Sequence, residues 1–234
     1  MIRSWSFKLF ALVLSFAVLA GTASAGTITG VQTFGLQDGT GPGLGTVSVV
    51  VVPTSNPDND NQVGGEATDN NISVPVKRFD KLGEIDIVFQ IQPSGGVGGV
   101  TEYKVFESVD NNTSINWSDY IMELGFGTGA NFIPVPSGSG LDFDFPTFDS
   151  SPVSSAFSTV TPVGENKLIF TDGVQSTGSE TYQFRIDVPD SPISGVAFES
   201  FTLRQTPIGV PEPSSVLLLL GAVACLGLYR KLRT

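Results

Sequence analysis

Histidine is absent from the 234 residues of this chain, and cysteine occurs once, at Cys225. The lack of histidine excludes Ser-His-Asp triads, Cys-His pairs and histidine-ligated zinc sites. A single cysteine cannot form a disulfide within the chain, so a folded body must be stabilised by its core alone. Because these gaps remove much of the usual catalytic chemistry, we predict that the protein is not an enzyme.

Basic residues are scarce between residues 26 and 209. This stretch holds 22 Asp and Glu against 7 Lys and Arg, a net charge of −15. Such a balance disfavours binding to nucleic acid or to anionic lipid headgroups, so we predict no nucleic-acid partner. An acidic surface serves solubility, which we favour, and the alternative is that divalent cations bridge the carboxylates.

The N-terminus has the composition of a secretory signal peptide. Arg3 and Lys8 precede an uncharged run at residues 9–20, and the small residues Ala23 and Ala25 come after it. The run is shorter than the roughly 20 residues that a membrane-spanning helix needs, and the Ala-x-Ala pattern fits cleavage after Ala25. We therefore predict a signal helix within residues 1–25 and export of the chain from residue 26 onward.

Residues 26–209 have the pattern of one all-β domain. Clusters of glycine and proline separate short stretches in which apolar and polar residues alternate, as in residues 84–91 and 181–188. Alternation with a period of two indicates strands with one face on a core and one in water. Further strand candidates are residues 28–35, 46–52, 101–109, 167–171 and 196–203. Many short strands with turns between them predict an antiparallel β-sandwich, jelly-roll-like or immunoglobulin-like.

Two stretches of the body are harder to assign. Residues 47–52 are nearly all valine, which is compatible with a strand buried on both faces. In residues 116–124 the apolar side chains keep a helical spacing, but their types suit a strand equally well. We leave helix and strand open for this second stretch.

The most polar part of the body, residues 56–71, contains a candidate calcium loop. Oxygen-bearing side chains recur through it, and the candidate ligands are Asp58, Asp60, Glu66 and Asp69. Hard cations such as Ca²⁺ accept such oxygens from flexible loops. An EF-hand is excluded because its turn glycine is replaced by Val63 and no helices flank the loop. A solvated turn is the favoured interpretation, and we expect no resident cofactor.

Three further patterns in the body have ordinary structural explanations. Asp142 and Asp144 would share one face of a strand, at a separation compatible with a pair of glycosidase carboxylates. Trp117 and Tyr120 could stack on sugar rings, although an aromatic side chain in a sandwich is more often part of the core. Residues 125–130 match a dinucleotide-binding turn, but the prolines after them forbid the helix it requires. We favour surface aspartates, core aromatics and a glycine-rich turn.

Residues 210–234 form a distinct C-terminal segment. It begins with Val210 and the motif Pro211-Glu212-Pro213, continues with an uncharged apolar run at residues 216–229, and ends in a basic tail at residues 230–234. The apolar run predicts a short hydrophobic helix, marginal in length for a membrane span. The basic tail favours an orientation with the body outside the inner membrane.

This segment resembles the PEP-CTERM sorting signal of bacterial exported proteins. The resemblance covers about 25 residues and rests on Pro211, Glu212 and Pro213, followed by the apolar run and the basic stop at Arg230 and Lys231. It implies recognition by an exosortase, a membrane-embedded cysteine transpeptidase that cleaves near the motif. It also implies a bacterium with an outer membrane that makes extracellular polysaccharide.

Together these patterns predict a non-enzymatic protein of the cell surface or extracellular matrix. The resemblance implies passage through the inner membrane as an intermediate, processing by the exosortase, and delivery to the surface or beyond it. The alternative is a carbohydrate-binding module acting on extracellular polysaccharide. We expect three parts: a signal peptide (1–25), a β-sandwich body (26–209) and a sorting signal (210–234).

Overall fold

Twelve β-strands and one short 3₁₀ helix make up the part of the chain that the structure describes, which is a computed structural model covering residues 26–56, 59, 70–92, 99–144, 150–189 and 199–210. The predicted all-β class is confirmed for these residues. The predicted signal helix and hydrophobic helix lie outside the described residues. None of the helical structure in the described ranges is long and apolar enough to cross a membrane.

Seven strands form one sheet. Its order is β1–β4–β12–β6–β10–β9, and β7 pairs with β6 beside this path. Every pair in this sheet is antiparallel. The strands are β1 (Thr27–Val31), β4 (Ile85–Gln92), β6 (Trp117–Phe126), β7 (Ile133–Pro134), β9 (Phe157–Pro162), β10 (Lys167–Gly173) and β12 (Ser200–Gly209).

Five strands form the second sheet, in the order β2–β3–β5–β11–β8. They are β2 (Leu44–Val51), β3 (Asn70–Phe79), β5 (Val100–Asn111), β8 (Val153–Ser154) and β11 (Gly178–Pro189). Here the expectation of a purely antiparallel sandwich is wrong, because β3 and β5 run parallel. Their register shifts between Val74 and Lys77, which places Pro75 at an irregularity where its missing N–H removes no ladder bond.

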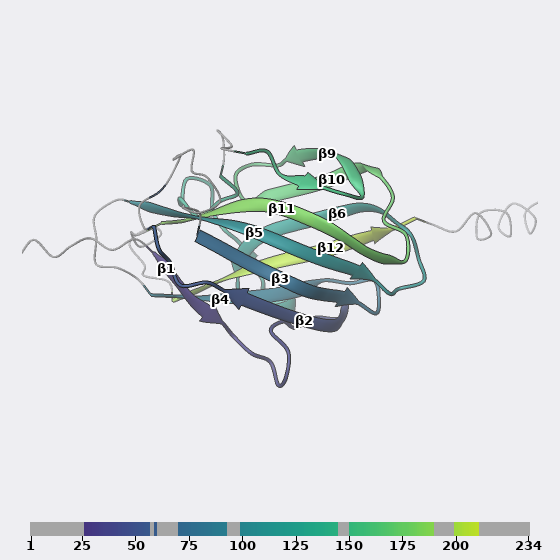
Figure 1. Ribbon diagram of the computed structural model, residues 1–234, viewed down its shortest axis with the longest axis horizontal. Helices are drawn as coiled ribbons and strands as arrows, with labels where there is room; N and C mark the ends of the chain where they lie inside the picture. The colour runs from purple at the N-terminus through teal and green to yellow at the C-terminus, as the bar shows by residue number, and fades with distance from the viewer. Residues whose placement is uncertain are drawn as a thin grey trace, which may run out of the picture.

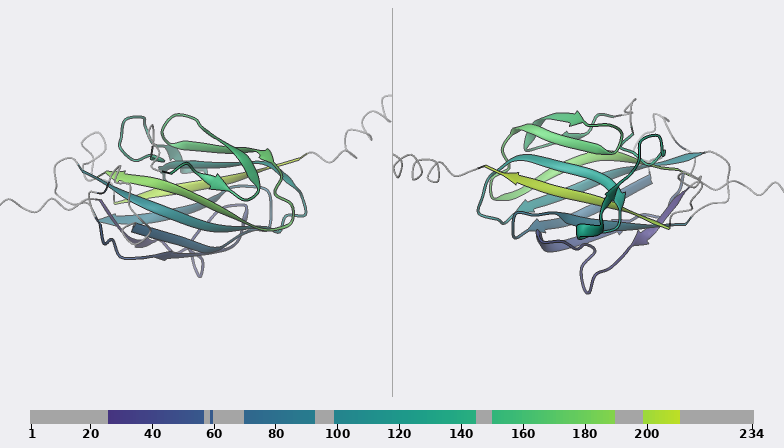
Figure 2. Two further views of the ribbon diagram at one scale, coloured as in Figure 1. Left: turned by 45° about the horizontal axis from the view of Figure 1, so that its top comes forward. Right: turned by 180° about the vertical axis from the view of Figure 1, so that it is seen from behind.

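The two sheets lie face to face in two layers (Figure 1, Figure 2). A single cluster of buried apolar residues draws on both of them. From the seven-stranded sheet it takes Ile87, Phe89, Leu124, Phe170 and Leu203, and from the five-stranded sheet Val74, Val105, Phe184, Ile186 and Val188. The described body therefore has one common core between its sheets.

The alternation predicted for β4 and β11 holds on the core side of each strand. Ile85, Ile87 and Phe89 on β4 are fully buried, and so is Ile186 on β11. Phe184 on β11 is 1% exposed. The opposite faces differ from the prediction of a water-exposed surface, because Asp86 on β4 and Asp187 on β11 are buried too. Residues distant in the sequence cover both aspartates.

Residues 117–126 form a strand, β6, which settles the open question of helix or strand for this stretch. The core side chains Tyr120, Met122 and Leu124 follow a period of two. Trp117 also faces the core, although its position breaks this alternation. The register between β6 and β12 shifts between Ile208 and Gly209, and Gly209 stands opposite Trp117. This irregularity lets Trp117 face the core out of step with the alternation, which explains why the buried residues have a helix-like spacing in the sequence.

The valine run at residues 47–52 is not buried on both faces. It forms most of β2, which is the edge strand of the five-stranded sheet, so that only β3 pairs with it. Val47 is buried, whereas Val50 and Val52 are about half exposed. An edge strand has one face on the core and one in solvent, and a run of valines alone does not distinguish the two positions.

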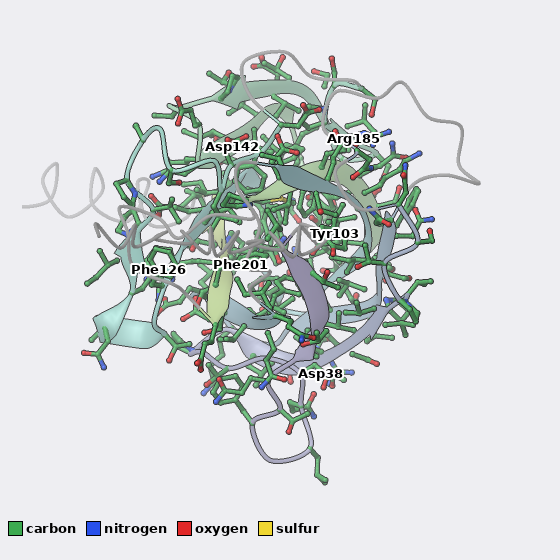
Figure 3. All side chains as sticks on the ribbon, turned by 90° about the vertical axis from the view of Figure 1, so that its left-hand side faces the viewer. Asp38, Tyr103, Phe126, Asp142, Arg185 and Phe201 are labelled. Atoms are coloured by element: carbon green, nitrogen blue, oxygen red, sulfur yellow. The ribbon has the colours of Figure 1, made fainter. Side chains whose placement is uncertain are left out.

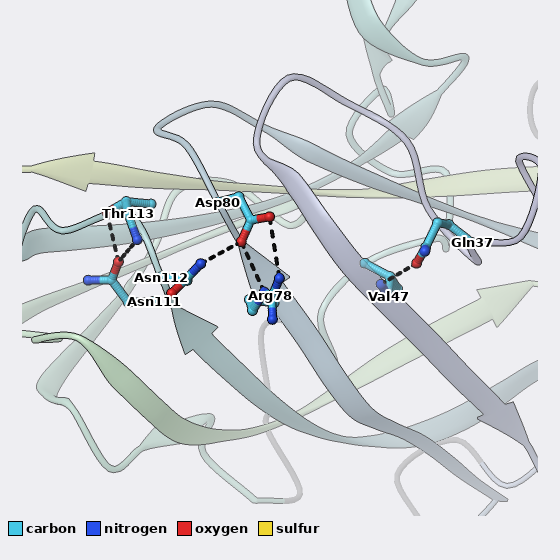
Figure 4. Close-up of polar contacts among 7 residues, drawn as sticks. All are labelled: Gln37, Val47, Arg78, Asp80, Asn111, Asn112 and Thr113. Carbon is cyan, nitrogen blue, oxygen red and sulfur yellow. Dashed lines mark hydrogen bonds and ion pairs between the residues drawn. The ribbon is translucent and has the colours of Figure 1, made fainter.

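Side chains also fix the loops next to the strands of the five-stranded sheet (Figure 4). Gln37 accepts a hydrogen bond at Oε1 from the backbone N–H of Val47 (2.9 Å), which holds the loop before β2 against that strand. At the end of β3, Asp80 accepts bonds from Asn112 Nδ2 (2.8 Å) and Arg78 Nε (2.9 Å). The hydrogen bond from Asn112 is the larger cause, and that from Arg78 the second, of a pKa for the Asp80 carboxyl below its usual value.

Candidate functional site

A cluster of three buried carboxylates lies on the outer face of the five-stranded sheet. Glu102 on β5 and Asp187 on β11 stand opposite each other in the antiparallel register, and Asp144 comes from the loop after β7. One oxygen of each lies within 4.8 Å of the other two. Among the described residues this is the group of carboxylates that could hold a metal ion.

The loop that carries Asp144 is fixed to the sheet by backbone bonds. Asp142 and Asp187 exchange N–H···O bonds of 3.3 and 3.0 Å, and Phe143 packs edge-on against Phe184 with ring centroids 5.8 Å apart. Asp144 comes next in the left-handed region, at φ +50°. The described part of the loop thereby lies alongside β11, and Asp142 and Arg185 both lie toward the top of the molecule in Figure 3. The carboxylates that strand alternation would leave in water are buried here.

Cationic side chains lie in the same region of the sheet. The Arg185 Nη1 group forms an ion pair with Glu102 Oε1, and Arg185 Nε donates to Ser150 Oγ (3.1 Å). Lys104, opposite Arg185 in the register, places its ammonium 5.0 Å from the centroid of the Phe106 ring. Since the protein supplies positive charge to the carboxylates, the cluster alone does not define a cation site.

The carboxylates Asp142 and Asp144 do not form the predicted pair on one face of a strand. Asp142 makes an isolated bridge to Asp187, and the positive φ of Asp144 breaks the extended geometry that the prediction required. Both side chains are buried, so the favoured interpretation of them as surface aspartates is also wrong. Phe143 is part of the core, as predicted.

Trp117 and Tyr120 are core residues, so their prediction as a sugar-stacking pair is wrong. Both are fully buried, and their rings stack on each other at 5.8 Å with an interplanar angle of 5°. Tyr182 packs against Tyr120 from the other sheet at 4.9 Å. The favoured interpretation of these aromatics as packing is confirmed. Residues 125–130 turn the chain after β6 with Gly127 and Gly129 at positive φ, which confirms the glycine-rich turn.

The remaining predicted site residues lie outside the described part of the chain. They are the calcium candidates Asp58, Asp60, Glu66 and Asp69, the cleavage residues Ala23 and Ala25, and the sorting residues Pro211, Glu212, Pro213, Arg230 and Lys231. Asn59, which lies between Asp58 and Asp60 in the sequence, belongs to the described residues and is buried. Its Oδ1 accepts the backbone N–H of Glu102 (2.9 Å), so this point of the polar loop contacts the acidic cluster.

A surface hollow of about 520 Å³ lies over β3, β5, β8 and β11. Two aromatic residues, a carboxylate, an amide and several hydroxyl-bearing residues line it, together with three apolar residues. The lining residues are Ser73, Val74, Pro75, Phe106, Glu107, Ser108, Val153, Ser154, Ser155, Thr181, Tyr182 and Gln183. No sequence pattern indicates this hollow, because it depends on the irregularity at Pro75 and on the short pairing of β8 with β11.

Comparison with family models, with curated proteins and with solved structures finds no match for this chain.

Proposed function

We propose that this chain is an exported, exosortase-processed protein of the cell surface or extracellular matrix, with a structural or interaction role for its body. The proposal rests on the signal-peptide pattern of residues 1–25, on the resemblance of residues 210–234 to a PEP-CTERM signal, and on the fold between them. We further propose that the two-layered body belongs with jelly-roll-like or immunoglobulin-like β-sandwiches, an architecture that needs no disulfide when its core is large.

The position of the last strand of the body supports this proposal. The last strand, β12, ends at Gly209, and the backbone N–H of Val210 still donates to the carbonyl of Asn116 (2.8 Å). The next residue is Pro211, which has no N–H and cannot continue a strand ladder in the same way. The sorting motif therefore follows in the sequence directly after a strand that is paired with β4 on one side and β6 on the other.

The burial of the clustered acidic side chains supports a non-enzymatic role. The carboxylates best placed for acid–base chemistry, those of Glu102, Asp144 and Asp187, are buried and lie beside Arg185. General acid–base catalysis requires a group within hydrogen-bond reach of a bound substrate. A covered cluster of this kind is better suited to fixing a loop on the sheet.

Replacing Glu212 with alanine is expected to block processing. In a host that expresses the exosortase, most of the variant should remain at full length in the inner membrane, because the motif has lost its one charged residue. Immunoblots of membrane, surface and medium fractions measure this. Removing the positive charges of Arg230 and Lys231 should give the same result, since the basic stop orients the segment.

The matched control is Glu199→Ala, which removes an exposed carboxylate from the body just before β12. This variant should mature like the unmodified chain. Normal maturation of the Glu212 and basic-tail variants would rule out the sorting proposal.

The surface hollow favours the alternative function, binding of extracellular polysaccharide. Phe106 offers a half-buried ring, and Gln183 and Thr181 offer polar groups next to it. Sugar-binding sites combine an aromatic face with a few polar groups that fix orientation. This location differs from the one predicted from the sequence, since Trp117 lies in the core.

If the hollow binds polysaccharide, Phe106→Ala should weaken binding about 10-fold, the equivalent of roughly 1.4 kcal/mol for one lost aromatic contact. A glycan array identifies a binding glycan, and titration calorimetry with that glycan then compares the variants. Val50→Ala, an exposed apolar truncation on the edge strand β2, is the control and should bind normally. Equal affinity of all three proteins, or no glycan bound by the unmodified chain, would exclude the hollow as a sugar site.

A further inference from the structure

Three chemically complementary side chains meet in the core between the two sheets. Lys77 on β3, Glu107 on β5 and Gln205 on β12 come from separate parts of the chain, and Gln205 reaches them from the opposite sheet. The side chains of Lys77 and Glu107 have no exposed surface, and Gln205 is fully buried. An amine, a carboxylate and a carboxamide are thus enclosed together.

Their contacts form a closed triangle. Lys77 Nζ lies 2.7 Å from Glu107 Oε1, and Gln205 Nε2 donates to Glu107 Oε2 at 2.7 Å. The third side is a direct contact between Lys77 Nζ and Gln205 Oε1. Glu107 therefore bridges the two nitrogen atoms, with one of its oxygens on each.

The group contains more than a buried ion pair, since a carboxamide contacts both charged side chains. Buried charges are costly to desolvate, and replacing such a pair by apolar residues is often neutral or stabilising. Here the amine touches the carboxamide, which is an electrophile, and the carboxylate can transfer protons between them. These are the nucleophile, the acceptor and the proton carrier of an amide-exchange reaction.

The surroundings favour such chemistry. Tyr182 stands opposite Glu107 in the register of β5 and β11, and Tyr120 offers a buried hydroxyl that has no hydrogen-bond partner among the described residues. Burial, and then the charge of Glu107, raises the pKa of Tyr120. Burial also lowers the pKa of Lys77 to about 8, so a larger fraction of its amine is neutral and nucleophilic.

We propose that Lys77 and Gln205 become joined by an amide bond that the folded chain forms on itself, with Glu107 as the proton carrier. One proton moves from the Lys77 ammonium to Glu107, giving a neutral amine and a carboxylic acid. The Nζ lone pair then attacks the Gln205 Cδ, and an Nζ–Cδ bond forms as the Cδ–Nε2 bond breaks. Glu107 gives its proton to the departing nitrogen through Oε2 and takes one from Nζ through Oε1, so ammonia leaves and the acid is restored.

The bond would join β12, a central strand of the seven-stranded sheet, to β3 of the five-stranded sheet across the core. It can form only after folding, because the three side chains lie on β3, β5 and β12. It would also supply the covalent constraint that this chain, with its single cysteine, cannot obtain from a disulfide. This inference does not depend on export or on sorting.

Mass spectrometry of the full chain tests the proposal. The denatured protein should have a mass about 17 Da below that of its sequence, after allowance for processing at either end, since the new amide releases one ammonia. Digestion with a protease that cuts after glutamate should give residues 67–84 joined to the peptide that begins at Ser200. This digest keeps Gln205 internal, so that cyclisation of an N-terminal glutamine does not imitate the loss of ammonia.

Two variants separate the roles. Lys77→Arg keeps a cation but removes the nucleophilic amine, and Glu107→Gln keeps the shape but removes the proton carrier. Both should have the full mass and no linked peptides. Lys167→Arg, which changes the partly exposed lysine that pairs with Glu123, should retain the link.

The unmodified chain decides the matter without any variant. Full mass and separate peptides from a protein whose circular dichroism shows the β-fold would overturn the proposal and leave a buried ion pair. A linked Glu107→Gln protein would overturn the role assigned to Glu107.

Discussion

Replacing Trp117 with alanine is expected to lower the free energy of unfolding by about 3–5 kcal/mol, the range for loss of a large aromatic from a core. The indole is fully buried, stacks on Tyr120 and meets the Phe79 ring edge-on at 5.2 Å. Its Nε1 donates to Thr113 Oγ1 (3.2 Å). Alanine would leave a cavity where β6 packs against the five-stranded sheet.

Urea unfolding followed by far-UV circular dichroism measures this loss. Fluorescence suits the unmodified body, because Trp117 is the one tryptophan after residue 25, but the variant lacks that signal. Trp117→Phe is the control and should cost less, since it keeps an aromatic ring and loses mainly the bond to Thr113. An alanine variant within about 1 kcal/mol of the unmodified body, a bound set at the usual size of surface effects, would contradict the buried position of Trp117.

Replacing Asp86 with alanine should be comparably destabilising, by about 3–5 kcal/mol, because it removes a fully buried carboxylate and leaves the partly buried guanidinium of Arg204 without its charge partner. Asp86 is fully buried and receives two bonds from Arg204, each 2.8 Å, and one from the Gly129 N–H (2.8 Å). Arg204 in turn packs over the Phe132 ring at 4.0 Å. The hydrogen bond with Asp86 is the main cause that raises the pKa of Arg204.

The exposed pair of Asp80 and Arg78 provides a matched control for this experiment (Figure 4). Their side chains are 38% and 42% exposed, so Asp80→Ala should cost only about 0.2–1 kcal/mol and less at high salt. Both variants lose a carboxylate that pairs with arginine, and they differ mainly in burial. Equal losses from Asp86→Ala and Asp80→Ala in urea unfolding would show that burial of Asp86 does not matter.

The sequence predicted the core faces of strands better than their outer faces. In β4 the alternating isoleucines and phenylalanine were sufficient, because the period of a strand is a local property. Asp86 was expected in water, and it is buried because Thr40 pairs with its backbone and the turn at Gly129 covers its carboxylate. Arg185 and Asp187 on β11 differ from expectation for the same reason, since Asp142 pairs with the backbone of Asp187 and Ser150 accepts a bond from Arg185.

The group of Lys77, Glu107 and Gln205 could not be predicted from the sequence. Residues 70–79 carry a proline and two basic residues, which make β3 resemble a polar segment. The three partners come together only through the parallel pairing of β3 with β5 and the packing of β12 across the core. Each is an ordinary polar residue among its own sequence neighbours.

The place of β12 also determines how the body responds to a mechanical pull. The strand is central in its sheet, with β4 on one side and β6 on the other, and the described chain leaves the molecule from its end, opposite the end where β1 begins (Figure 1). A protein tethered through this end and dragged by flow would be pulled along β12. Its hydrogen bonds to both neighbours would then be strained together in shear rather than broken one at a time. If the chain is attached through the proposed sorting motif, the strand next to that motif is the one placed to transmit force from the body to the attachment.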